Sequence, residues 1–377
     1  MTLPLITTLL TIATVTAVWW SIPAFARPQL PFGVRVPPDR VADESIAAAR
    51  RDFTGRITIL GVVAMFACLP VILLETPAAV PAVFIICLVV ADTIAYILAN
   101  RAISAAKRRG DWYRGTKQAV VANTSLRTDP VRVRWRWLVP AGSIFVLTAV
   151  IGAIEYPRLP STLPALDGFL LESGKRVPTG FLGAFHPVLA QAGLIAIIAV
   201  VVVGLGRTRP ELDASRPAGS ARRYRRYLES LSILLFITAA AVSLTLSGMA
   251  LRLWELAEPS VALSIMIGAP LVAAIIAAVV FQVRVGQAGD RLPAEPGEEA
   301  ESSGVVQRDD DRYWYLGGFV YANRDDPAIF VHPRIGGSNW TINLGHPVGR
   351  VIVVSLLGTA ATVTLLSSLG VITIPSK

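Results

Sequence analysis

One carboxylate, Asp92, stands in the middle of an apolar segment that covers residues 80–99. A carboxylate at the centre of a bilayer costs about 2.5–3.5 kcal/mol on insertion scales, so such residues normally face a helix-bundle interior or a water-filled cavity. Two interpretations follow. Asp92 contacts an ion, a proton or a ligand, or it is a protonated or hydrogen-bonded carboxyl group that joins two helices.

A second polar set lies near the outer ends of two later apolar segments, at Glu155, Asp167 and His186. These residues could line a pocket that opens to the outside, or they are solvated loop charges. The histidines do not indicate a metal centre, because the topology derived below separates His186 from His332 and His346. Since catalytic zinc needs three protein ligands at one place, we expect no metal and no cofactor.

Several catalytic patterns are absent from the sequence. It contains no Gly-x4-Gly-Lys-Ser/Thr loop, no Gly-x-Ser-x-Gly elbow and no His-Glu-x-x-His pair. The usual signatures of ATP-driven pumps, serine hydrolases and zinc peptidases are therefore missing, and we predict that the protein is not an enzyme. A membrane enzyme acting on lipid-linked substrates is a further alternative, but it would need clustered carboxylates that the sequence does not show.

The elements that position these residues are predicted to be membrane-spanning helices. The 377 residues are 53% hydrophobic and 16% charged, with a mean hydropathy of +0.57, whereas soluble domains are roughly 25% charged. A spanning helix needs about 20 mostly apolar residues. We predict eight spans, at about residues 4–25, 57–76, 80–99, 138–155, 187–206, 231–251, 261–283 and 350–373.

Basic residues set the predicted orientation. Of the 35 Lys and Arg residues, 30 fall in every second connection, namely in segments 26–56, 100–137, 207–230 and 284–350. Short loops rich in Lys and Arg stay in the cytoplasm. Both termini are therefore predicted to lie outside. Arg outnumbers Lys by 31 to 4, which is typical of high-GC bacterial coding sequences. We therefore expect a multi-pass protein of a bacterial plasma membrane.

The net charge of +9 has an explanation in the membrane itself. Each Lys or Arg near an anionic lipid surface gains about 1 kcal/mol. We predict that one basic run contacts the anionic lipid bilayer in this way, through Arg222, Arg223, Arg225 and Arg226. Nucleic-acid binding also needs a folded surface that contacts the bases, so we expect none.

The fold class that follows is an all-α polytopic membrane protein with a small cytoplasmic β-hairpin module before the last helix. The predicted parts are a membrane domain at 1–283, a flexible acidic linker at 284–304, a cytoplasmic module at 305–348, and an eighth span with an outer C-terminus at 349–377. Segments 328–331 and 340–344 are the expected strands. About 35 residues cannot hold a core alone, so the hairpin should pack against the membrane domain or a partner.

Two segments resemble domain families of unknown function. Residues 154–164, with Asp167 and Gly168, resemble DUF1648 in their Tyr-Pro and Leu-Pro pattern after a span, over about residues 138–190. The His-Trp or His-Phe pair of that family is replaced here by Ala165 and Leu166.

Residues 321–331 and 339–347 closely resemble DUF5808. The candidate residues of this cytoplasmic module are Asp325, Asp326, Phe330, Trp340, Asn343 and His346.

The first resemblance carries the functional expectation. DUF1648 occurs in an immunity-protein family that protects bacilli from a secreted sporulation-delay toxin and that also signals by sequestering a repressor. It implies a non-enzymatic immunity or signalling protein, with an outer face that senses a peptide or envelope state and an inner module that engages a cytoplasmic regulator. The alternative is a transporter or channel with Asp92 in its path.

Overall fold

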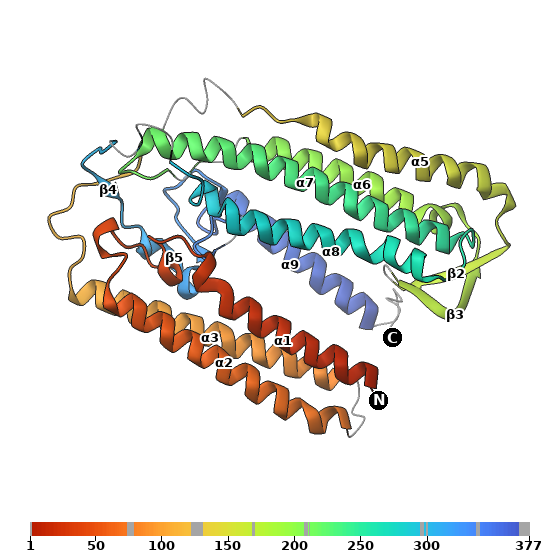
Figure 1. Ribbon diagram of the computed structural model, residues 1–377, viewed down its shortest axis with the longest axis horizontal. Helices are drawn as coiled ribbons and strands as arrows, with labels where there is room; N and C mark the ends of the chain where they lie inside the picture. Colours follow the sequence, from red (N-terminus) through yellow and green to blue (C-terminus); the bar gives the residue numbers. More distant parts are fainter. Residues whose placement is uncertain are drawn as a thin grey trace. The chain divides into compact units, whose positions relative to one another are not determined.

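The computed structural model describes residues 2–73, 79–121, 131–167, 170–206, 210, 212–294, 298, 301–336 and 340–368 (Figure 1). Its α-helices are α1 (Thr2–Phe25), α2 (Glu44–Leu73), α3 (Ala79–Arg109), α5 (Val139–Glu155), α6 (Phe181–Leu205), α7 (Pro217–Leu253), α8 (Val261–Arg284) and α9 (Pro347–Ser368). Within the described residues, seven helices are long and apolar enough to cross a membrane, and Pro347–Thr359 is a shorter apolar helix. The predicted fold class, a polytopic helical membrane protein, is confirmed.

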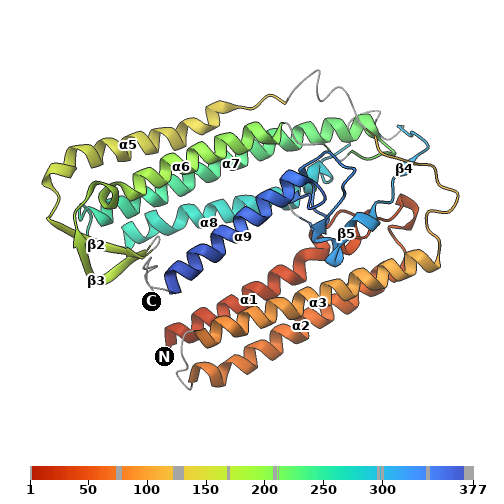
Figure 2. The same cartoon turned by 180° about the vertical axis from the view of Figure 1, so that it is seen from behind.

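The chain divides into two compact units. Unit 1 comprises Met1–Asn123, Arg209–Ala221 and Val285–Leu356, and unit 2 comprises Thr124–Thr208, Arg222–Arg284 and Leu357–Lys377. In unit 1, the helices α1, α2 and α3 lie side by side, as both views show (Figures 1 and 2). In unit 2, the helices α5, α6, α7 and α8 run alongside one another.

Helix α2 begins directly after Asp43, whose Oδ1 accepts hydrogen bonds from the Ser45 amide (3.0 Å) and hydroxyl (2.6 Å). These bonds hold the pKa of Asp43 below its ordinary value. Such a cap satisfies an amide that has no partner within the helix. The second span, predicted at about 57–76, is part of one continuous helix that begins at this point.

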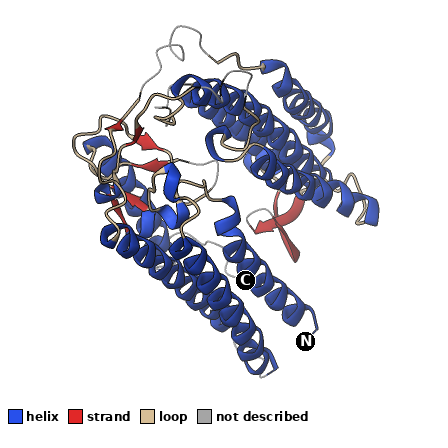
Figure 3. Ribbon diagram, turned by 60° about the vertical axis from the view of Figure 1, so that its left-hand side comes forward, coloured by secondary structure: helices blue, strands red, loops and turns tan. Residues whose placement is uncertain are grey.

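The module consists of short strand pairs in unit 1, gathered at one end of α1–α3 (Figure 3). β1 (Gln118–Ala119) and β4 (Val306–Gln307) pair in parallel, whereas β5 (Trp314–Tyr315) with β6 (Val320–Tyr321), and β7 (Phe330–Val331) with β8 (Thr341–Ile342), pair antiparallel. A bridge between Tyr321 and Asn343 joins the last two pairs. The predicted hairpin is confirmed with shorter strands.

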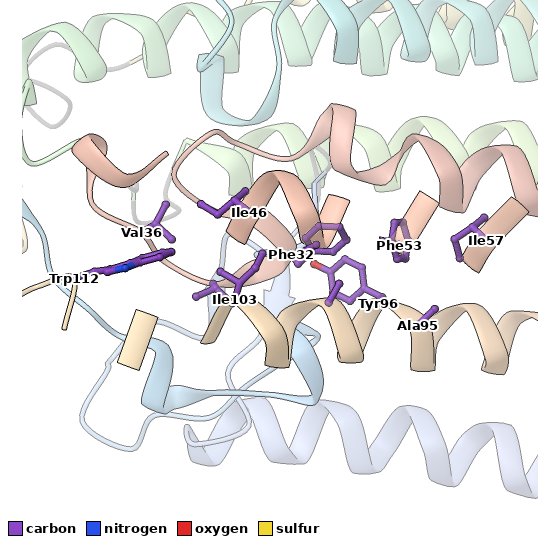
Figure 4. Packing of buried hydrophobic residues seen from close by; sticks show 12 residues of the cluster. Phe32, Val36, Ile46, Phe53, Ile57, Ala95, Tyr96, Ile103 and Trp112 are labelled. Atoms are coloured by element: carbon purple, nitrogen blue, oxygen red, sulfur yellow. The ribbon is translucent and has the colours of Figure 1, made fainter. Parts of the chain in front are cut away.

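The core of unit 1 includes the loop between α1 and α2. Its buried members are Phe32, Val34, Val36, Ile46, Ala49, Phe53, Ile57, Ala95, Tyr96, Ala99, Ile103 and Trp112 (Figure 4). The Phe32 ring centroid lies 5.0 Å from that of Phe53 and 5.4 Å from that of Tyr96. Proline prevents this loop from continuing a helix, and its apolar side chains pack between α2 and α3 instead.

The segment expected to be a linker contacts the start of α7 within unit 1. The Glu301 carboxylate accepts hydrogen bonds from the amides of Ala218 (2.8 Å) and Gly219 (2.9 Å). The first amides of a helix have no partner within the helix and favour negative charge. This acidic residue therefore stabilises the N-terminus of α7.

Unit 2 carries an antiparallel hairpin that the sequence analysis did not predict, formed by β2 (Thr162–Asp167) and β3 (Leu170–Pro178). Leu163 of β2 is buried in a cluster with Phe185 and Trp254. The Trp254 indole also donates a hydrogen bond of 2.8 Å to the Ala184 carbonyl. A lone hairpin is marginal in water, and these helix ends supply the apolar surface that it needs. The prolines of the segment hid the strand pattern.

Candidate functional site

Six charged side chains meet where the module contacts α3 and the α1–α2 loop. This ion-pair cluster consists of Arg35, Lys107 and Arg334 with Asp309, Asp310 and Asp311. The three cations are 5%, 8% and 2% exposed, respectively. A buried charge is costly unless it is paired. Three carboxylates for three cations supply that pairing.

Arg334 lies at the centre of this cluster. Its guanidinium pairs with the carboxylates of both Asp310 and Asp311, and Nη1 also donates to the Gly33 carbonyl at 2.8 Å. The guanidinium carbon lies 5.0 Å from the centre of the Trp314 ring. A planar fork with several donors suits such a site better than an ammonium group does.

The other two cations come from the α1–α2 loop and from the last turn of α3. Arg35 Nε lies 2.8 Å from Asp310 Oδ1. Lys107 Nζ lies 2.6 Å from Asp311 Oδ2 and 2.7 Å from Asp309 Oδ2. The cluster therefore joins three segments that are far apart in the sequence.

Two turns with left-handed backbone touch beside the cluster. Gly33 has φ +76° and Gly317 has φ +72°, and a Cβ atom added at Gly33 would lie 2.7 Å from the Gly317 carbonyl oxygen. Next to them, the Phe319 ring of the module lies 5.4 Å from the Tyr96 ring of α3. Glycine permits both the positive φ and the close approach. The module therefore packs against unit 1 through backbone, aromatic and ionic contacts.

The cluster changes the protonation equilibria of its members. Burial alone would raise the pKa of Asp311, but the charges of Arg334 and Lys107 and their hydrogen bonds outweigh burial and lower it. Burial raises the pKa of Tyr113 far above its usual range, opposed by the charge of Arg35. At neutral pH Asp311 is therefore a carboxylate and Tyr113 a neutral phenol.

We expect module packing to weaken in acid. Because the pKa of Asp311 is lower in the folded state than its ordinary 3.8, the stabilisation is complete above that value and is lost as the pH falls through the lowered pKa. The measurement is hydrogen exchange of the module amides over an acid series, compared at each pH with Asp311→Asn. A wild-type to variant ratio that stays constant over the series would contradict this assignment.

A cavity of about 540 Å³ opens beside the cluster, within unit 1. Its lining includes Arg308, Arg312, Asp325, Trp314 and His332. Small-molecule pockets span about 300–1,000 Å³, so this one has the volume for a small ligand or for one or two side chains of a protein partner. It places the candidate Asp325, which is exposed, at its rim.

Asn343 is the most constrained of the module candidates. It is 0% exposed, and its Nδ2 lies within hydrogen-bond distance of the carbonyls of Asn323 (2.9 Å), Asp326 (3.2 Å) and Ala328 (3.1 Å). Its Oδ1 accepts from the amides of Asn323 (3.0 Å) and Gly345 (2.9 Å). Asn343 therefore fixes the loop between β6 and β7, and its role here is structural.

The neighbouring candidate Asp326 has a similar role. Its carboxylate accepts hydrogen bonds from the Tyr321 hydroxyl (2.9 Å) and the Ala328 amide (3.0 Å). Burial raises the pKa of Tyr321 above its usual range, so the phenol remains the donor. The pair holds the loop against β6.

The remaining module candidates are spread over its surface. The Trp340 ring lies 5.3 Å from that of His332, and His346 Nδ1 accepts a hydrogen bond of 3.2 Å from the Val348 amide at the start of α9. Phe330 is 44% exposed. Among the described residues, no group of three or more His, Cys, Asp or Glu side chains is arranged to hold a metal ion.

Asp92 lies apart from the ion-pair cluster, inside the helices of unit 1. It is 0% exposed, and neither carboxylate oxygen has a hydrogen-bond partner within the part of the chain that the structure describes. Asp92 is therefore enclosed, and whether it contacts an ion, a proton or a ligand or only joins two helices stays a prediction.

The outer-face and lipid-contact candidates belong to unit 2. Glu155 ends α5 and pairs with Arg158 at 3.0 Å, His186 is exposed on α6, and the Asp167 side chain lies outside the described residues. Four arginines lie on the first turns of α7, with Arg226 exposed and Arg222, Arg223 and Arg225 partly exposed. Lipid contact by these arginines and a sensing role for the outer set remain predictions.

Sequence reasoning missed the aspartates of the ion-pair cluster. Three consecutive carboxylates in a chain of net charge +9 are the signal that could have identified them. It also missed that two of the inner-segment cations, Arg35 and Lys107, pair with these carboxylates.

A polar network joins three helices of unit 2. Thr148 and Ser247 hydroxyl oxygens lie 2.6 Å apart, and Gln191 Nε2 donates to the Ser243 carbonyl (2.8 Å) and to Ser247 Oγ (2.9 Å). Gln191 and Thr148, as polar residues inside apolar spans, were the available signal. The network joins α5, α6 and α7, as interhelical hydrogen bonds do in membranes.

Comparison with known proteins adds one finding. Residues 324–350 match DUF5808, a family of unknown function. The match includes Arg334 and Asn343, and so covers part of the ion-pair cluster and the side chain that fixes the β6–β7 loop. No curated protein and no solved structure matches the chain. The DUF5808 resemblance is thus confirmed, whereas the resemblance to DUF1648 stays a prediction.

Proposed function

We propose that this chain is a non-enzymatic membrane protein of the signalling or immunity type, in which the DUF5808 module is the cytoplasmic output. The observation that carries the proposal is the ion-pair cluster. It connects the module to the ends of the helices in unit 1 through contacts that can be made or broken as a set. A domain held in this way can exchange its internal contacts for those of a partner.

The proposed orientation places the module in the cytoplasm of a bacterium and both termini outside. The alternating distribution of Lys and Arg supports this topology. The partner on the inside is a regulator protein, and the ligand on the outside is a peptide or an envelope component. The β2–β3 hairpin and its cluster around Trp254 are the proposed outer receptor surface.

The first experiment measures survival of a strain lacking this protein under a panel of membrane-active peptides. The strain is complemented with wild type, with Arg334→Met, which loosens the module, or with Arg324→Met. Arg324 is exposed in the same segment and is the matched control. We expect selective sensitivity that wild type and Arg324→Met rescue, and that Arg334→Met fails to rescue at equal expression.

Equal survival of all four strains across the panel would remove the support for an immunity role. Rescue by Arg334→Met as complete as that by wild type would show that module packing is not part of the output.

Transport is the second candidate function, and the burial of Asp92 without a partner among the described residues favours it. An unpaired carboxyl inside a span is a common feature of ion and proton pathways. In reconstituted vesicles, Asp92→Asn is expected to abolish ion flux if the protein is a transporter. Flux that is the same with wild type, variant and empty vesicles would exclude this candidate.

A further inference from the structure

Asp92 lies between two apolar clusters of unit 1. On α3, Leu88 belongs to a cluster with Ile12 and Ala64, and Ala95 belongs to the cluster around Phe32. Asp92 falls between Leu88 and Ala95, so it occupies a layer with apolar side chains on both sides. A bare carboxylate in such surroundings loses several kcal/mol of hydration with nothing to replace it.

Among the described residues of this layer, one further side chain has a buried oxygen without a hydrogen-bond partner, whereas the hydroxyls of Thr14, Thr58 and Thr93 bond carbonyls of their own helices. Thr16 lies on α1 between Ile12 of one cluster and Trp19, which packs against the other. Gly61 lies on α2 between Ile57 and Ala64, which belong to the same two clusters. Thr16 Oγ1 is buried and has no hydrogen-bond partner within the described residues. A Cβ atom at Gly61 would lie 2.6 Å from this oxygen, so the two helices approach closely there. Within the described residues, the layer thus offers buried oxygen atoms without partners from two side chains.

This oxygen count distinguishes between a proton and a metal cation. Calcium takes about 6–8 oxygen ligands and magnesium about six, more than Asp92 and Thr16 supply. One proton is enough to make Asp92 neutral and removes the need for a counter-ion.

In the described stretches of α1, α2 and α3 that form these clusters, no other charged residue competes for this role. Helix α1 contains no charged residue, and α2 contains none between Ile57 and Leu73. Between Ala79 and Asn100 of α3, Asp92 is the only charged residue. The other titratable side chains in these stretches are Cys68, Cys87 and Tyr96.

Asp92 is one helical turn from the residue that contacts the module. Tyr96 follows it by four positions, so both side chains lie on the same face of α3. The Tyr96 ring lies 5.4 Å from Phe319 of the module and 5.4 Å from Phe32 of the α1–α2 loop. A charge at Asp92 would draw water into the layer or turn α3, and either change moves Tyr96.

We propose that Asp92 is a proton-binding site whose occupancy controls the packing of the DUF5808 module against unit 1. With the proton bound, the layer is neutral and the module is held. Release breaks the O–H bond of the carboxyl group and passes the proton to water, which leaves a carboxylate in the apolar layer and loosens the module. The regulatory part rests on the proposed function, whereas proton binding itself does not.

Proton binding is tested by infrared spectroscopy of the protein in lipid vesicles, with carboxyl-labelled aspartate. We expect a C=O band of a protonated acid at neutral pH that shifts on exchange into D2O and is absent from Asp92→Asn. Wild type alone is informative, because the band and its isotope shift do not depend on how the variant folds. Absence of any protonated aspartate band in wild type would overturn the proposal.

Control of the module is tested by hydrogen exchange of Val320 and Tyr321 as the pH is raised. At each pH, wild type is compared with Asp92→Asn, which resembles the neutral acid, and with Asp52→Asn, which removes an exposed carboxylate from α2. We expect these amides to exchange about tenfold faster in wild type than in Asp92→Asn at high pH, a change that about 1.4 kcal/mol produces. Asp52→Asn should follow wild type.

Identical pH profiles for wild type and Asp92→Asn would overturn the control of the module. If instead both spectroscopic and exchange results are as expected while Arg334→Met rescues survival fully, the proton site stands and the proposed signalling output falls.

Discussion

Replacing Arg334 by Met is expected to release the module from unit 1. The substitution leaves Asp310 and Asp311 with one cation fewer in a site where Arg334 is 2% exposed, and it leaves the Gly33 carbonyl without its donor. Removing one partner of a fully buried ion pair costs about 3–5 kcal/mol. Because the Asp310 and Asp311 side chains are 30% and 28% exposed and keep Arg35 and Lys107, we expect the lower end of this range. Module amides should then exchange about 10²–10³ times faster, at about 1.4 kcal/mol per factor of ten.

Two further variants make the Arg334 measurement specific. Arg324→Met removes an exposed arginine from the same segment and should leave exchange unchanged, because exposed charges contribute little. Arg334→Lys keeps the charge but loses the planar guanidinium that reaches both carboxylates and the carbonyl. The exchange rates of its module amides should therefore lie between those of wild type and Arg334→Met. If Arg334→Met and Arg324→Met behave alike, the cluster does not hold the module.

Eight spans were predicted, and within the described residues seven helices are long and apolar enough to cross a membrane, with a shorter apolar helix at the predicted eighth span. The spans could be predicted from the sequence because a bilayer imposes strong constraints. Backbone groups in lipid must be paired internally, which leaves helices as the solution for long apolar segments. Long runs without a charged residue, such as 187–206, therefore identify a span with little ambiguity. The β2–β3 hairpin was not predicted, because Pro160, Pro164 and Pro178 mask the alternation and because part of its packing surface, around Trp254 directly after α7, is distant in the sequence.

The ion-pair cluster could not be predicted for a related reason. Arg35 and Asp310 are 275 positions apart, and no local pattern indicates that they meet. Sequence reasoning assigned the inner-segment cations to lipid, because a cation near an anionic surface and a cation in an ion pair look the same in a one-dimensional count. Burial distinguishes the two, and burial depends on how the α1–α2 loop folds around Phe32.

Asn343 could be identified from the sequence as a candidate residue, but its structural role could not be predicted. The resemblance to DUF5808 identified it as a candidate, and the strand pattern placed it within the predicted strand 340–344, whereas the observed strand ends at Ile342. Its role as a structural residue required coordinates, since five backbone groups from two separate segments converge on one amide. A polar residue after a strand is equally compatible with a binding role.

Replacing Asn343 by Ala is expected to unfold the loop between β6 and β7. It leaves buried backbone groups without their side-chain partner, and each such group costs about 1–3 kcal/mol. Because water can enter the emptied site and satisfy some of them, we expect a net loss of about 2–4 kcal/mol. The readout is hydrogen exchange at Asn323 and Gly345, whose amides bond Asn343 Oδ1, with Thr341→Val on the adjacent strand as control.

The variant Asn343→Asp tests the acceptor contacts of Oδ1 and the donor contacts of Nδ2 separately. The aspartate keeps an acceptor for the amides of Asn323 and Gly345, but it places a second oxygen against the carbonyls of Asp326 and Ala328, where Asn343 presents its donor. We therefore expect it to destabilise the module at least as much as Ala does at neutral pH, and less in acid, where a protonated carboxyl group can donate. If Asn343→Ala leaves both amides protected, the strand pairing alone holds the loop, and Asn343 becomes available for a role in binding.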